Sequence, residues 1–130
     1  MMAVVSAGLV GIDLECMREI GRVDDITAST FAPAEHAEFG AVPAPDRLAW
    51  FYRAWTRKEA VVKLTGHGLR AGIRGVDVRG PAAVVTPLPE GWPADPLQLR
   101  NLAAPSGYVA ALAHTGQVST VRLCQGPARG

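Results

Sequence analysis

A single long amphipathic segment, residues 46–64, is the feature that most constrains the fold of this chain. Pro45 and Asp46 open it as they open many helices, and the stretch Thr65-Gly66-His67-Gly68 closes it with the glycine that commonly ends one. Apolar side chains recur on more than one side of the segment. The pattern therefore predicts a long helix that packs against neighbours on several faces.

The other apolar segments are short and bounded by turn residues, which is typical of strands. Five follow the helix and one precedes it: Ile73–Val78, Ala82–Leu88, Leu97–Leu102, Tyr108–Ala113, Val118–Cys124 and, before the helix, Ala3–Leu14. Two shorter helical stretches are predicted at residues 24–32 and 33–39. We expect an α+β fold, a single compact domain with a small antiparallel sheet packed on one long helix. This domain covers residues 1–124, and residues 125–130 form a frayed tail.

Length and composition exclude several classes of protein. A chain of 130 residues with 48% hydrophobic residues forms one domain with a real core. The apolar stretch at residues 1–12 is shorter than the roughly 20 residues that cross a bilayer, so no membrane partner is expected. A net charge of +1 without a nucleic-acid-binding motif argues against a nucleic-acid partner. Cys16 and Cys124 have no metal-site spacing and are too few for a disulfide framework, which favours a reducing, cytoplasmic location.

Charge is strongly segregated along the chain. Residues 1–46 carry eight acidic and two basic side chains, whereas residues 47–79 carry eight basic and two acidic ones. This asymmetry suits a protein that holds a cation with one segment and an anion with the other. It equally suits two segments that simply attract each other, and composition leaves both explanations open.

Two carboxylates lie two positions apart in the segment Val10-Gly11-Ile12-Asp13-Leu14-Glu15. On a strand, Asp13 and Glu15 share a face. Their repulsion in a partly buried site is on the order of 4 kcal/mol, which is tolerated at a free surface or around a cation. Oxygen ligands from one or two carboxylates are what Mg²⁺ uses beside substrate phosphates. The alternative is a strand end that has reached solvent.

The long helix carries the other candidate site. Trp55, Glu59 and Lys63 fall within one stripe of its surface, which begins apolar and ends in an i,i+4 charge pair. Facing Asp13 and Glu15, Glu59 would complete a three-carboxylate cation site, and Lys63 would reach an anion held by that cation. An ordinary surface ion pair is the alternative.

Other possible sites are weaker. The segment Gly66-His67-Gly68-Leu69-Arg70-Ala71 follows a helix instead of a strand, so it is interpreted as a turn and not as a dinucleotide site. The three histidines are scattered along the chain. Trp55 is interpreted as a residue that anchors the core, and a contact with a cofactor is the less favoured alternative.

Taken together, GIDLE at residues 11–15, WTRKEAVVK about 40 residues later and then GHGL resemble the 4′-phosphopantetheinyl transferases. That family is recognised by a G-[IV]-D-x-E strand and a W-x-x-K-E-A-x-x-K helix. The acid at Glu15 and the tryptophan resemble the two-lobed, surfactin-synthetase-activating branch. The resemblance covers essentially the whole chain and implies the phosphopantetheinyl transferase half-fold.

The resemblance implies a reaction and its residues. The family transfers 4′-phosphopantetheine from coenzyme A to a serine of an apo acyl or peptidyl carrier protein and releases adenosine 3′,5′-bisphosphate. By analogy, Asp13, Glu15 and Glu59 hold Mg²⁺ on the pyrophosphate. Glu59 helps to deprotonate the serine, Lys63 steadies the phosphates, and Lys58 matches a motif position implied to contact coenzyme A.

The two-lobed members are about twice as long as this chain, and the lobe that precedes the GID strand has no counterpart in residues 1–9. Many of the contacts that the two-lobed members make with the adenine and the 3′-phosphate of coenzyme A are expected to be missing. We expect a homo-oligomer in which a second copy supplies the other side of the coenzyme A site. A truncated chain and an inactive descendant of a transferase remain as alternatives. The competing functional hypothesis is a non-catalytic module that binds a carrier protein or coenzyme A.

Overall fold

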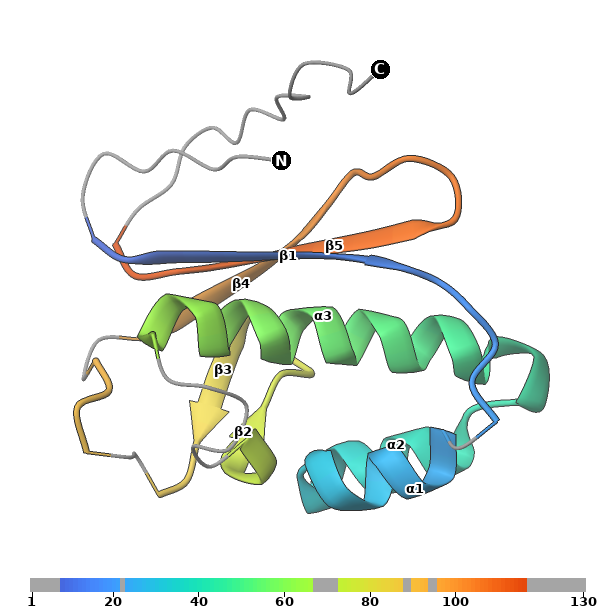
Figure 1. The fold of residues 1–130 in the computed structure, drawn as a ribbon. Helices are drawn as coiled ribbons and strands as arrows, with labels where there is room; N and C mark the ends of the chain where they lie inside the picture. The colour runs from blue at the N-terminus through green and yellow to red at the C-terminus, as the bar shows by residue number, and fades with distance from the viewer. Residues whose placement is uncertain (1–7, 22, 67–72, 88–89, 94–95, 117–130) are drawn as a thin grey trace.

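The computed structural model describes residues 8–21, 23–66, 73–87, 90–93 and 96–116. Its elements, in chain order, are β1 (Val10–Cys16), α1 (Val23–Thr30), α2 (Pro33–Ala41), the 3₁₀ turn η1 (Ala44–Asp46), α3 (Arg47–Thr65), the 3₁₀ turn η2 (Ile73–Gly75), β2 (Val76–Asp77), β3 (Ala82–Val85), β4 (Leu97–Leu102) and β5 (Tyr108–His114). The strands form one antiparallel sheet in the order β1-β5-β4-β3-β2, so β1 from the start of the chain pairs with β5 from its end. Figure 1 shows β1 and β5 above α3, with α1 and α2 below it, while β3 and β2 continue the sheet down past the helix.

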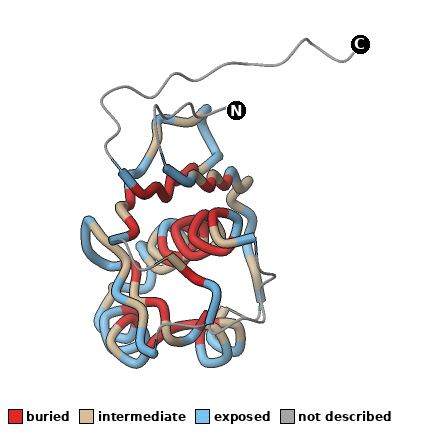
Figure 2. The backbone as a smooth tube through the Cα atoms, turned by 90° about the vertical axis from the view of Figure 1, so that its left-hand side faces the viewer, coloured by how far each residue is buried: buried red, intermediate tan, exposed pale blue. Residues whose placement is uncertain are grey.

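Helix α3 is the centre of the molecule. It contacts β1, β5 and β4 on one side and α1 and α2 on the other. Ala60 and Val61 are fully buried, and Figure 2 shows the buried residues concentrated in this helix and in the sheet next to it. The helix ends at Gly66, whose φ of +73° is the left-handed conformation that glycine adopts without steric cost. Burial on all sides explains why its apolar residues do not form a single stripe.

An aromatic cluster joins α3 to the two short helices. Phe31, between α1 and α2, stacks on Phe51 with 5.7 Å between ring centroids and meets Trp50 edge-on at 5.4 Å. Phe39 of α2 packs against Trp50 at 5.3 Å. Such pairs add about 0.5–1.5 kcal/mol each beyond the area they bury. They hold α1 and α2 against α3 and leave the opposite side of that helix to the sheet.

The structure confirms the α+β architecture, with a small antiparallel sheet on one long helix. Helix α3 and strand β4 lie within one residue of their predicted ranges. The prediction of a strand over residues 73–78 is wrong for its first half, which forms η2 and leaves only Val76–Asp77 as strand. The segments predicted at residues 3–7, 118–124 and 125–130 lie outside the described residues. Among the described helices, none combines the length and apolar character that a membrane crossing requires.

Candidate active site between strand β1 and helix α3

Strand β1 lies unusually close to α3 because residue 11 has no side chain. A Cβ placed on Gly11 would lie within 3 Å of three backbone atoms of α3, the carbonyl oxygen of Ala60 and the amide nitrogen and Cα of Leu64. These atoms belong to a regular helix and cannot rotate out of the way. The glycine of the GIDLE segment therefore sets the distance between β1 and α3. One pleat further along, the same face of β1 presents Asp13 to the helix.

Asp13 and Lys63 form the direct contact between the two elements. The Lys63 Nζ atom lies 2.6 Å from Asp13 Oδ1 and donates a hydrogen bond to it. The Asp13 side chain is 3% exposed and that of Lys63 is 52% exposed. The hydrogen bond from Lys63 to Asp13 raises the pKa of the Lys63 ammonium, and the Glu59 and Glu15 carboxylates add to that effect. Lys63 therefore remains protonated at neutral pH, with one side against Asp13 and the other in solvent.

Glu15 and Glu59 lie close enough to Lys63 for their charges to raise the pKa of its ammonium group, and with Asp13 they are referred to as the acidic cluster. Burial raises the pKa of Glu59, the Asp13 charge raises it further, and Lys63 opposes both. Burial also raises the pKa of Glu15, with contributions from Asp13 and Glu59. All three carboxylates thus interact electrostatically, and each addition of negative charge is costly without a cation.

Trp55 belongs to both the core and the site. Its ring stacks on Phe51 at 5.9 Å, which is the predicted role as a core anchor. Its side chain also forms a hydrogen bond with Glu15 that lowers the pKa of that carboxyl group. One end of the ring is therefore packed in the aromatic cluster and the other supports the ionised form of Glu15.

The donor set fits a hard divalent cation that takes some of its ligands from a substrate. Asp13 Oδ2 is buried and has no hydrogen-bond partner, so one oxygen in the cluster is left for another ligand. Across the described part of the chain, no three His, Cys, Asp or Glu side chains are gathered closely enough to hold a metal ion by themselves. Mg²⁺ is commonly bound by one or two carboxylates together with substrate phosphates and waters, so a complete protein cage is not required.

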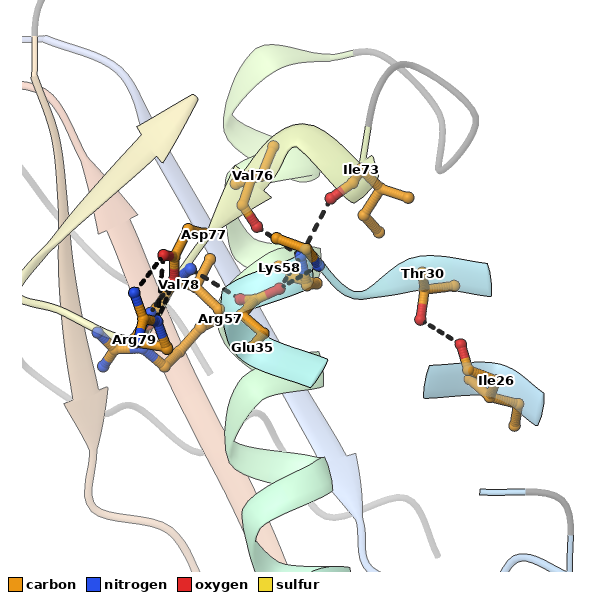
Figure 3. Close-up of polar contacts among 11 residues, drawn as sticks. Ile26, Thr30, Glu35, Arg57, Lys58, Ile73, Val76, Asp77, Val78 and Arg79 are labelled. Atoms are coloured by element: carbon orange, nitrogen blue, oxygen red, sulfur yellow. Dashed lines mark hydrogen bonds and ion pairs between the residues drawn. The ribbon is translucent and has the colours of Figure 1, made fainter. Parts of the chain in front are cut away.

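Lys58 lies on a different side of α3 and is fully buried. Its Nζ atom is 2.6 Å from Glu35 Oε1 and donates to the carbonyl oxygens of Ile73 at 3.0 Å and Val76 at 2.5 Å. Figure 3 shows the lysine enclosed by these groups. Burial lowers the pKa of Lys58, while the Glu35 charge acts in the opposite direction. The sequence-based assignment of Lys58 to coenzyme A is therefore not supported, because its ammonium group is committed to partners inside the protein.

Sequence reasoning missed Glu35 and Arg57. Arg57 is buried, donates to the Val78 carbonyl oxygen at 2.8 Å and to Asn101 Oδ1 at 2.9 Å, and also bonds the Gly80 carbonyl oxygen. A signal was present for Lys58, since it lies four residues after Ala54 and three before Val61, both of which are buried. A charge in such a stripe indicates a buried partner. No local pattern indicates which residue that partner is.

A family model described as the 4′-phosphopantetheinyl transferase superfamily matches residues 9–113. That range contains both β1 and α3 and therefore the whole of the acidic cluster. The chain belongs to this superfamily. The resemblance carried by GIDLE and WTRKEAVVK is confirmed at the level of the family.

Known 4′-phosphopantetheinyl transferases are similar in sequence to part of this chain. The 4′-phosphopantetheinyl transferase AcpT of Salmonella typhimurium is 40% identical over 77 residues, which is 59% of this chain and 40% of that protein. The 4′-phosphopantetheinyl transferase of Bacillus subtilis is 30% identical over 105 residues, 79% of this chain and 45% of that protein. This transferase-family chain thus spans less than half the length of these two relatives.

A solved structure has the same fold. The crystal structure of Thermotoga maritima holo-[acyl-carrier-protein] synthase superposes with a TM-score of 0.56, over 90% of this chain and 66% of that one, at 16% sequence identity. The agreement extends to the antiparallel sheet and its long helix.

Proposed function

We propose that this chain transfers 4′-phosphopantetheine from coenzyme A to a serine hydroxyl of an apo acyl or peptidyl carrier protein. The single observation that carries the proposal is the acidic cluster of Asp13, Glu15 and Glu59 around Lys63, at the contact of β1 with α3. The family provides the reaction, and the cluster provides the groups that such a reaction needs.

The residues divide between binding a cation and moving a proton. Asp13, Glu15 and Glu59 would hold Mg²⁺ together with the phosphates of coenzyme A and waters, and the bound ion would neutralise charge on the pyrophosphate. Glu59 accepts the serine proton, directly or through a water, since a hydroxyl is a poor nucleophile without a base in hydrogen-bond reach. The serine oxygen forms a bond to the phosphorus that bears the pantetheine. The bond from that phosphorus to the bridging oxygen breaks, and adenosine 3′,5′-bisphosphate leaves with the electron pair.

Lys63 has the exposure that its proposed role requires. Half of its side chain is accessible, so its charge can reach the phosphates while Asp13 holds it at the site. The interaction with Asp13 also raises its pKa and keeps the ammonium charged. A positive charge in this place stabilises negative charge that develops on the leaving diphosphate.

We also propose that the active form is a homo-oligomer, located in the cytoplasm, in which a second copy adds to the coenzyme A site. The sheet face that points away from α3 exposes Leu14 of β1 and Tyr108 of β5, at 42% and 44%. These exposed apolar side chains would place an oligomer contact on the face of the sheet opposite to Asp13.

The alternative is a module that binds a carrier protein or coenzyme A without turnover. The Lys63 ammonium group favours it, because it is in contact with Asp13 where a cation would bind.

Intact-protein mass spectrometry distinguishes the two functions. An apo carrier protein is incubated with the chain, coenzyme A and Mg²⁺, and in parallel with a chelator. A mass gain of one phosphopantetheine that is lost on chelation supports the transferase. Absence of any gain with several carrier proteins, while circular dichroism shows a folded chain, supports the binding module.

A further inference from the structure

We propose that Glu35 is a positioning residue for the site: its buried carboxylate fixes the rotation of α3 about its axis, and so directs Glu59 and Lys63 toward β1. The proposal rests on the function proposed above for its kinetic consequences. The geometric part stands on the described contacts alone.

One carboxylate joins three separate segments. Glu35 Oε1 accepts the amide of Ala32 at 2.8 Å, which caps α2, and lies 2.6 Å from Lys58 Nζ on α3. Glu35 Oε2 accepts the amide of Val78 at 2.8 Å, just after β2. Both Glu35 and Lys58 are 0% exposed. Figure 3 shows Lys58 and Val78 converging on the Glu35 carboxylate, with α2 beside α3.

Lys58 transmits this constraint to the helix. Its ammonium group has three oxygen partners, Glu35 Oε1 and the carbonyl oxygens of Ile73 and Val76, and it lies 5.5 Å from the centre of the Phe31 ring. An ammonium group has three protons to donate, so every donor has a partner. A side chain fixed in this way resists rotation of the helix in either direction.

Glu59, the residue after Lys58, would be displaced at the site by any rotation of α3. Glu59 follows Lys58 and lies about 100° further round the helix, on the side of Asp13. At a side-chain radius of about 5–6 Å, a rotation of 10° moves the carboxylate by about 1 Å. The Lys63 to Asp13 contact, at 2.6 Å, would be lost by a movement of this size. Misplacement by 1 Å can cost on the order of 100-fold in rate.

The test compares Glu35→Gln, the double variant Glu35→Gln/Lys58→Met and the control Glu38→Gln. Glu38 lies on the same helix, where it accepts a hydrogen bond from Trp50 Nε1 at an exposed site. Glu35→Gln leaves the buried Lys58 without its carboxylate partner and so loses stability. The double variant removes both buried charges, so it should recover that stability without restoring the hydrogen bonds of Glu35 and Lys58. Kinetics are measured well below each melting temperature.

We expect Glu35→Gln to lower kcat by about 10- to 100-fold, with KM for coenzyme A and carrier protein within about twofold of the parent. The double variant should regain most of the melting temperature and little of kcat, and Glu38→Gln should behave as the parent. A double variant with the parent kcat would overturn the proposal, because Glu35 would then only balance a charge.

A second measurement does not depend on turnover. In ¹H–¹⁵N correlation spectra of folded Glu35→Gln, we expect shifts at the amides of Gly11, Asp13 and Lys63, far from the substitution. Shifts confined to α2 and residues 73–78 would overturn the positioning role. An inactive parent would contradict the proposed function and leave this measurement decisive for Glu35.

Discussion

Substitution of Gly11 by alanine tests the closeness of β1 and α3 on which the site depends. The added Cβ would lie 2.9 Å from the Cα of Leu64 and within 3 Å of two further backbone atoms of α3. The carbonyl oxygen of Ala60 would be only 2.0 Å away, and ordinary contacts begin at about 3.5 Å, so strand and helix must separate by about 1 Å or more. Overpacking of this kind costs about 1–3 kcal/mol. With an unfolding entropy of about 2.1 cal/mol/K per residue, the melting temperature of a chain this size falls by about 4–11 °C.

The same separation acts on the site. Lys63 Nζ and Asp13 Oδ1 are 2.6 Å apart, and a shift toward 1 Å takes them out of hydrogen-bond distance. We therefore expect phosphopantetheine transfer to fall by about 10- to 100-fold in the folded variant. The assays are differential scanning calorimetry and the mass-spectrometric transfer assay.

Gly40→Ala is the matched control. Gly40 lies in α2, and a Cβ there meets nothing within 4 Å. Alanine at a helical position adds roughly 0.5–1 kcal/mol of stability, so this variant should melt slightly higher than the parent and keep its activity. An unchanged melting temperature together with full activity in Gly11→Ala would refute the argument that residue 11 sets the distance.

Three further predictions follow from the electrostatics and the helix end. Lys63→Met leaves the buried Asp13 carboxylate without its cation and should lower the free energy of unfolding by about 1 kcal/mol, a value discounted for the exposure of Lys63. Because the pKa of Lys63 is raised above 10.5 on folding, that stabilisation is present at pH 7 and is lost as pH rises through the folded pKa. Urea titrations of parent and variant should therefore differ at pH 7 and converge above that pKa; a constant difference would contradict this. Burial raises the pKa of Glu59 above 4.5 in the metal-free protein, so an NMR titration of its carboxyl carbon without Mg²⁺ should give a pKa above 4.5, and added Mg²⁺ should lower it. A metal-free pKa below 4.5 would contradict the burial of this carboxyl group. Gly66→Ala forces a side chain into a φ of +73° and should cost about 1 kcal/mol, seen as a fall of about 4 °C in melting temperature; no fall would contradict the assigned helix end.

The elements best predicted from sequence are those whose signals are local. Helix α3 follows from Pro45 and Asp46 before it and Gly66 after it, and strand β4 from an apolar run bounded by turns. The acidic cluster was also accessible, because a period of two and a period of 3.6 are enough to place Asp13 and Glu59 on definite faces. That these faces meet was a hypothesis, because periodicity alone also allowed an ordinary surface ion pair.

The buried polar network could not be predicted because its partners are distant in sequence. Glu35 and Lys58 are 23 positions apart, and Lys58 meets carbonyl groups 15 and 18 positions further on. The same network explains the error at residues 73–78. The Ile73 and Val76 carbonyl oxygens accept hydrogen bonds from Lys58, and a 3₁₀ turn there replaces the first half of the predicted strand.

The central claim is that the acidic cluster between β1 and α3 performs the transfer. The most direct measurement is the transfer rate of Glu59→Gln beside Glu38→Gln, each with coenzyme A, Mg²⁺ and an apo carrier protein that the parent modifies. Both substitutions remove one carboxylate charge from a helical glutamate, but only Glu59 lies beside Asp13. We predict a loss of at least about 100-fold for Glu59→Gln with an unchanged fold, and the parent rate for Glu38→Gln. A Glu59→Gln rate equal to that of the parent would contradict the account.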